Sequence, residues 1–287
     1  MKWLKWLSLI LGGLFVLILL FINLMAPRFR YADRKIAKTF KETAIPYKIH
    51  REQYCGAPIR WTEAGNTNAQ TLIFFFHGAP GGFGDFKDYM IDPDFTNNSL
   101  MVSMDRLGYG HSHYGKGEPS IIKHVEAARF VLEHYEPDTI LLVGYSYGGP
   151  ISGSYAARYP DKLKALLMLA PVNHPDAEKI FWFNPVLDTW VAKRLLPRMI
   201  KVANVEKIGH AVALDAIRED WKKIKIPVTH MHCMDDWIAP YEANTNWSKE
   251  HLPADQLQLI EWDGNSHFLP GQVKERIKPV LLDLVAK

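Results

Sequence analysis

Cysteine is scarce in this sequence, and no block of like charges occurs. The two cysteines in 287 residues, Cys55 and Cys233, lie far apart and lack the spacing of a metal or redox motif, so nothing indicates a disulfide. The 34 Lys and Arg residues nearly balance the 31 Asp and Glu residues, and they are not clustered as on a nucleic-acid-binding face. Internal repeats and low-complexity segments are also absent. These absences argue against a disulfide scaffold, a repeat protein and a nucleic-acid-binding protein.

The sequence also lacks a convincing set of metal ligands. His230 and His232 lie two residues apart on a predicted strand, a spacing that can hold zinc, but no third ligand is evident. We therefore predict neither a metal nor a cofactor.

The N-terminal segment is a long apolar run. Residues 6–26 carry no charge, and about 20 apolar residues suffice for a helix to cross a bilayer. Lysines and arginines flank the run on both sides. We predict an uncleaved single-pass transmembrane signal-anchor over residues 1–26, which makes the membrane a partner, followed by a basic juxtamembrane connector over residues 27–46. A cleaved signal peptide and a buried helix are the alternatives, and the side of the membrane stays open.

From Tyr47 to the C-terminus, short apolar strands alternate with amphipathic helices. This alternation is typical of an α/β domain whose mostly parallel sheet is covered on both faces. The pattern changes over residues 171–225, where an aromatic, helical insertion interrupts it. We interpret residues 47–287 as one domain and the insertion as a small cap that lines a pocket for an apolar acyl substrate. Alternatively, its aromatic residues only pack the cap onto the core.

One stretch joins an apolar strand to a helix through a glycine-flanked serine. Residues 139–145 form the strand, and Ser146 stands between Gly144 and Gly148 in the pattern G-x-S-x-G. Such a sharp turn exposes the serine side chain at the end of the sheet. The pattern is weak alone, so its meaning depends on polar groups elsewhere.

Polar residues also follow other predicted strands, at positions that parallel strands would bring to one edge of the sheet. They are the loop His77-Gly78-Ala79-Pro80-Gly81, the pair Asp235-Asp236, and His267. Asp105, in another such loop, is interpreted as a structural residue that bonds backbone.

Five motifs in this order resemble those of the α/β-hydrolase superfamily. They are His77-Gly-x-Pro-Gly81, Asp105-x-x-Gly-x-Gly-x-Ser112, Gly144-x-Ser-x-Gly-Gly149, Asp236-x-x-x-Pro240 and Gly264-x-x-His-Phe268. The resemblance covers the chain from about Tyr47 to its end. It implies an α/β-hydrolase fold, with an eight-stranded, mostly parallel sheet flanked by helices.

The resemblance also implies a role for each site residue. Ser146 would be the nucleophile, His267 its general base and Asp236 the carboxylate that orients the imidazole. The backbone N–H groups of Ala79 and Tyr147 would form the oxyanion hole. Asp235 is the alternative to Asp236, which the spacing to proline favours.

The expected function is that of a serine hydrolase, most simply a carboxylesterase or lipase-like enzyme. A serine at the elbow excludes related dehalogenases and epoxide hydrolases, which need aspartate there. Two alternatives stay open. The loop that begins at His77 also resembles that of proline iminopeptidases, and a non-catalytic binding protein can share this fold.

Overall fold

The computed structural model describes residues 2–264, 267–268 and 270–287. Outside this part of the chain lie Met1, in the predicted anchor, and Asn265, Ser266 and Leu269, in the predicted histidine loop. One eight-stranded sheet has the order β1-β2-β4-β3-β5-β6-β7-β8. The pairs β1–β2 and β2–β4 are antiparallel and the others are parallel. The strands are β1 (Tyr47–Tyr54), β2 (Ala57–Gly65), β3 (Thr71–Phe76), β4 (Ser99–Met104), β5 (Thr139–Tyr145), β6 (Leu163–Leu169), β7 (Val228–Cys233) and β8 (Leu257–Trp262). The predicted mostly parallel, eight-stranded α/β sheet is confirmed.

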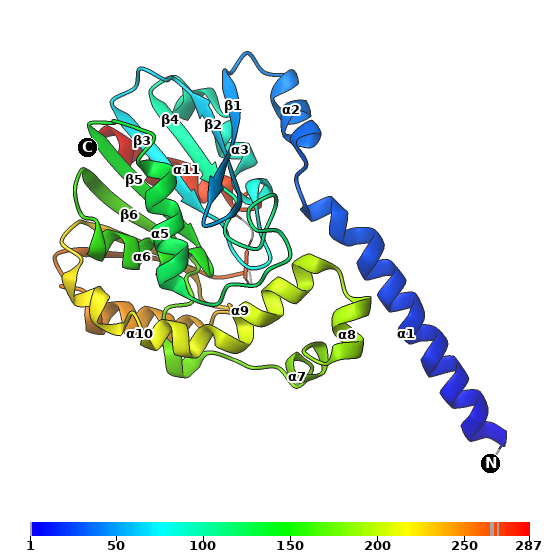
Figure 1. Ribbon diagram of the computed structural model, residues 1–287. Coiled ribbons are helices and arrows are strands. Elements are labelled where there is room, and N and C mark those ends of the chain that lie inside the picture. Colours follow the sequence, from blue (N-terminus) through cyan, green and yellow to red (C-terminus); the bar gives the residue numbers. More distant parts are fainter. Residues whose placement is uncertain (1, 265–266, 269) are drawn as a thin grey trace.

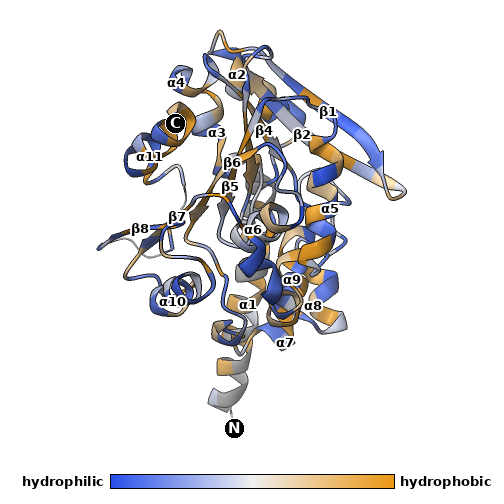
Figure 2. Ribbon diagram, turned by 90° about the vertical axis from the view of Figure 1, so that its left-hand side faces the viewer, coloured by the Kyte–Doolittle hydropathy of each residue, from blue (hydrophilic) through white to orange (hydrophobic). Residues whose placement is uncertain are grey.

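Helices cover both faces of this sheet, which explains the uninterrupted apolar runs of its central strands. In Figure 2, α5 (Ile121–Leu132) and α6 (Gly148–Arg158) lie on one side of the sheet, and α3 (Lys87–Met90) and α11 (Lys274–Ala286) lie on the other. Short pieces η1 (Phe83–Asp85) and α4 (Pro93–Thr96) and the helix α10 (Tyr241–His251) complete the layers.

The two cores follow the alternation of side chains along each strand. Phe74 and Phe76 of β3 belong to the core beneath α5 and α6, whereas Ile73 and Phe75 belong to the core beneath α3 and α11. Consecutive strand residues point to opposite faces, so one apolar strand supplies both cores.

The segment before the sheet forms two helices. α1 (Lys2–Phe29) extends away from the sheet, and α2 (Asp33–Lys41) packs its buried Ile36 and Phe40 against the core beneath α3 (Figure 1). In the part of the chain that the structure describes, no helix meets the length and apolarity that a membrane span requires. The predicted anchor over residues 1–26 is therefore not supported.

The insertion between β6 and β7 is helical. It contains η2 (Pro175–Ala177), α7 (Asn184–Leu187), α8 (Trp190–Leu195), α9 (Arg198–Asp215) and η3 (Arg218–Lys223). α9 crosses the C-terminal edge of the sheet, while α7 and α8 lie on the side nearest α1 (Figure 1). The Asn23 side-chain amide of α1 donates a hydrogen bond to the Leu195 carbonyl, at 2.9 Å.

Candidate active site

Ser146 lies on a strained turn between β5 and α6. Its φ of 51° is in the left-handed region, which costs a non-glycine residue conformational energy and marks a functional constraint. The turn needs glycine at both neighbouring positions because other protein atoms lie where a Cβ would be placed. A Cβ on Gly144 would lie 2.2 Å from Ser152 Oγ, and one on Gly148 would lie 2.2 Å from the Phe76 carbonyl oxygen.

Three predicted site residues meet in one hydrogen-bond chain, although they lie far apart in the sequence. His267 Nε2 is 2.9 Å from Ser146 Oγ, and His267 Nδ1 is 2.7 Å from Asp236 Oδ2. The parallel strands β5 and β7 and the loop after β8 bring these side chains to the same edge of the sheet. We call this arrangement the Ser146–His267–Asp236 chain.

The structure separates the two neighbouring aspartates. Asp236 is buried, and its Oδ1 accepts hydrogen bonds from the backbone N–H groups of Ile238 and Ala239. Burial alone would raise the pKa of Asp236, but the hydrogen bonds from His232 and His267 hold it well below its ordinary value. Asp235 is exposed and accepts a hydrogen bond from Gly264 N, at the start of the histidine loop. Asp236 is therefore the carboxylate in contact with His267.

His230 and His232 extend this chain into the core. His230 Nδ1 contacts Ser248 Oγ at 3.0 Å, and the two rings contact each other through Nε2 and Nδ1 at 2.9 Å. His232 Nε2 lies 2.9 Å from the Ala239 carbonyl and 3.3 Å from Asp236 Oδ2. Of the pair that sequence spacing offered as metal ligands, His232 therefore contacts the carboxylate of Asp236, and His230 contacts His232 behind it.

The two predicted oxyanion-hole residues flank Ser146. Ala79 and Tyr147 line the same cavity as Ser146, and Tyr147 N–H stands at the N-terminal end of α6. Backbone N–H groups at a helix N-terminus favour negative charge beside them. Their role as oxyanion-hole donors stays a prediction.

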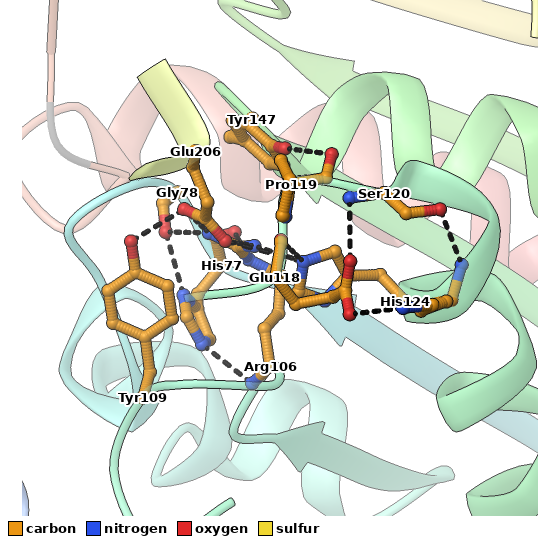
Figure 3. Close-up of polar contacts among 11 residues, drawn as sticks. His77, Gly78, Arg106, Tyr109, Glu118, Pro119, Ser120, His124, Tyr147 and Glu206 are labelled. Carbon is orange, nitrogen blue, oxygen red and sulfur yellow. Dashed lines mark hydrogen bonds and ion pairs between the residues drawn. The ribbon is translucent and has the colours of Figure 1, made fainter. Parts of the chain in front are cut away.

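A buried arginine holds the loop that carries Ala79. Arg106 Nε donates to the His77 carbonyl and Arg106 Nη2 donates to the Gly78 carbonyl, both at 2.9 Å, while His77 Nε2 accepts from Arg106 N. On its other side Arg106 pairs with Glu206 of α9, with Nη1 to Oε1 at 2.7 Å (Figure 3). Glu206 also accepts a hydrogen bond from Tyr109 Oη at 2.6 Å. One fully buried ion pair thus connects the insertion to Arg106, the residue that holds the Ala79 loop.

This pair was not predicted, although the sequence contained signals for it. Glu206 and His210 interrupt the buried stripe of α9 at a spacing of four residues, where apolar side chains are expected. Arg106 follows an apolar strand directly. Charged residues at such positions indicate buried partners, but their identity depends on where α9 crosses the sheet.

A cavity of about 240 Å³ opens at Ser146 beneath the insertion. Most of its wall is apolar. It is lined by Ala79, Ser146, Tyr147, Val172, Glu178, Phe181, Phe183, Asn184, Leu187, Ile200, Ala203, Asn204, Lys207, His210 and Ile238. The insertion therefore lies over the candidate nucleophile, and aromatic residues of its first half face the cavity.

Comparisons with known proteins agree with this architecture. Residues 71–196 match the family model described as alpha/beta hydrolase fold. The chain is 25% identical over 274 residues to the bifunctional esterase/perhydrolase of Acinetobacter calcoaceticus, covering 80% of this chain and 96% of that protein. It is 24% identical over 166 residues to a 2-hydroxy-6-oxo-2,4-heptadienoate hydrolase of Pseudomonas putida, covering 55% of this chain but only 56% of that relative.

A solved structure shows the same fold. MGS-M2, an alpha/beta hydrolase enzyme from a Medee basin deep-sea metagenome library, superposes with a TM-score of 0.65 at 18% identity, over 83% of this chain and 98% of that one. The chain therefore has the α/β-hydrolase fold. Fold and sequence matches together support its assignment to the α/β-hydrolase superfamily.

Proposed function

We propose that the protein is a serine hydrolase that cleaves carboxylic esters through an acyl-enzyme on Ser146. The observation that carries this proposal is the Ser146–His267–Asp236 chain at the cavity, with contacts of 2.9 and 2.7 Å. A serine hydroxyl becomes an effective nucleophile when a neighbouring base accepts its proton, and His267 Nε2 is placed to do so.

The proposed reaction has two halves. Ser146 Oγ attacks the ester carbonyl carbon while its proton passes to His267 Nε2, and the N–H groups of Ala79 and Tyr147 bind the resulting oxyanion. The tetrahedral intermediate then expels the alcohol, which takes the proton from His267. A water molecule gives its proton to His267 and attacks the acyl carbon, and collapse of this second intermediate releases the acid and restores the proton to Ser146. Asp236 stabilises the imidazolium formed in each half.

Ester chemistry fits the cavity better than an aminopeptidase reaction. An apolar wall suits an acyl chain, whereas a substrate with a free N-terminal ammonium group needs a carboxylate to bind it. The carboxylate in the cavity wall, Glu178, is already paired with Lys207 and His210. This pairing favours the esterase over the iminopeptidase alternative.

A substrate panel tests the proposal. Purified protein is assayed with p-nitrophenyl esters from acetate to decanoate and with prolyl p-nitroanilide. We expect turnover of the shorter esters and little of the anilide. Turnover of the anilide alone would favour the peptidase. No turnover together with no labelling by a fluorophosphonate probe would favour a non-catalytic binding protein.

A further inference from the structure

One side of the cavity wall is not apolar. Three ionisable side chains from the insertion, Glu178, Lys207 and His210, line it together with Phe181 and Leu187. None of them belongs to the Ser146–His267–Asp236 chain, so the esterase mechanism leaves them without a role. We call these three residues the polar subsite.

Close contacts join the three side chains of the polar subsite. The Glu178 side chain is 1% exposed; Lys207 Nζ pairs with its Oε1, and His210 Nδ1 lies 3.1 Å from its Oε2. Burial would raise the pKa of Glu178, but the hydrogen bond to His210 and the nearby Lys207 charge lower it, so the group is a carboxylate. A carboxylate only accepts hydrogen bonds, so Nδ1 is the His210 nitrogen placed to donate to Glu178.

The other ring nitrogen of His210 faces no protein partner. His210 is 2% exposed, and its Nε2 is buried without a hydrogen-bond partner among the described residues. The ring stacks on Tyr147, with centroids 4.2 Å apart and planes at 20°, which holds it beside the residue that follows Ser146. A buried ring nitrogen is unfavourable without a hydrogen-bond partner, whichever of the two partners donates.

Lys207 offers complementary donors. Its side chain is 21% exposed, and only one of its three N–H groups is needed for the pair with Glu178. A ligand group that bonds His210 Nε2 in either direction and also accepts from Lys207 Nζ would satisfy the subsite. A hydroxyl can do both, because it donates and accepts. A carboxylate would approach Glu178 against like charge.

We propose that the polar subsite binds a hydroxyl group on the acyl chain, so that the preferred substrates are esters of hydroxy-substituted carboxylic acids. This inference rests on the proposed esterase function. A plain hydrocarbon chain would leave His210 Nε2 buried and unpaired, which is unfavourable. A site built to bond a substrate hydroxyl discriminates strongly against the analogue that lacks it.

Matched ester pairs test the preference. Methyl 3-hydroxybutanoate, 3-hydroxyhexanoate and 6-hydroxyhexanoate are each compared with the unsubstituted ester of equal chain length. For at least one pair we expect kcat/KM to favour the hydroxy ester about tenfold or more, equivalent to about 1.4 kcal/mol. Equal or lower kcat/KM for all three hydroxy esters would overturn the inference.

Two variants test whether His210 and Lys207 cause the preference for hydroxy esters. His210→Phe keeps a ring against Tyr147 but removes both nitrogens, and Lys207→Met removes the donor; each should bring the hydroxy preference close to one. Val212→Ala, an exposed change on the same helix, should keep the wild-type preference. A preference that survives in both subsite variants would contradict the assignment.

Binding separates this inference from the proposed function. Calorimetric titration of the Ser146→Ala variant measures affinity for the same ester pairs without turnover. Tighter binding of the hydroxy ester, lost on adding His210→Phe, supports the subsite even if the wild type hydrolyses no ester. Equal binding of both members of every pair would overturn it.

Discussion

Arg106 and Glu206 join the loop after β4 to the insertion helix α9 through an ion pair in which neither side chain is exposed. The same guanidinium donates to the carbonyls of His77 and Gly78, the residues just before Ala79. The position of Ala79, a proposed oxyanion-hole donor, thus depends on contact between the insertion and the core. We regard Arg106 and Glu206 as positioning residues.

Replacing Glu206 by Gln should slow the chemical step. The amide keeps the shape of the side chain but removes the charge that orients Arg106, so Ala79 N–H loses its fixed position. Loss of an oxyanion donor costs about 10²–10³ in kcat, and a displaced donor less, so we expect about a tenfold lower kcat with a smaller change in KM. Steady-state kinetics on a p-nitrophenyl ester measure both.

A boronic-acid inhibitor gives this prediction a second readout, because its tetrahedral adduct uses the oxyanion hole. Its affinity should fall with kcat in the variant. Glu219→Gln, which changes an exposed carboxylate of η3, serves as the control. A lower melting temperature with normal kcat and normal inhibitor affinity would show that the pair acts on stability alone.

Replacing Asp236 should lower kcat far more than replacing Asp235. Asp236→Asn removes the charge beside His267 Nδ1 and allows the wrong tautomer, so kcat should fall by about 10⁴. Asp235→Asn keeps an oxygen for Gly264 N and should change kcat by less than about tenfold. Equal losses in both variants would contradict the role proposed for Asp236.

Acid should destabilise the protein partly through Glu206. Burial would raise its pKa, but Arg106 and His124 lower it from 4.5 to about 2, so the folded state favours the carboxylate. The stability from this group is therefore present above pH 4.5 and is lost as the pH falls toward 2. Urea unfolding at pH 7, 4 and 3 should show a steeper loss for the wild type than for Glu206→Gln. Parallel pH profiles would argue against this contribution.

The serine turn should not tolerate an added methyl group. Gly148→Ala would place Cβ 2.2 Å from the Phe76 carbonyl oxygen, a backbone atom that cannot move freely. Overpacking of this kind costs about 1–3 kcal/mol or more. Gly12→Ala, where no atom lies within 4 Å of the new Cβ, is the control. Denaturant unfolding compares the two, and similar stabilities would refute the steric argument.

Sequence patterns predicted the parts of the molecule that local chemistry determines. The apolar run of β5 and the glycines around Ser146 require a strand followed by a sharp turn, and parallel strands place Asp236 and His267 at the same edge. The contacts among the three residues agree with that prediction, while their catalytic roles stay predictions. Contacts between residues far apart in the sequence were harder to predict. Glu206 finds Arg106 because of where α9 crosses the sheet, and no local pattern encodes that crossing.

Helix bounds in the insertion show the same limit. The sequence indicated a helical insertion over residues 171–225 but not where its helices begin; α9 begins at Arg198, directly after Pro197. All three residues of the proposed polar subsite come from this insertion. The aromatic residues Phe181 and Phe183 lie in the cavity wall, whereas the charged residues of that wall were not anticipated.

The most direct test of the central claim is capture of the acyl-enzyme. Protein mixed with p-nitrophenyl butyrate is quenched in acid within milliseconds and analysed by peptide mass spectrometry. A butyryl group on the peptide that contains Ser146, absent in Ser146→Ala and accompanied by a burst of p-nitrophenol, is the predicted result. Ester turnover at the wild-type rate in Ser146→Ala, with no acyl group on the Ser146 peptide of the wild type, would contradict the account.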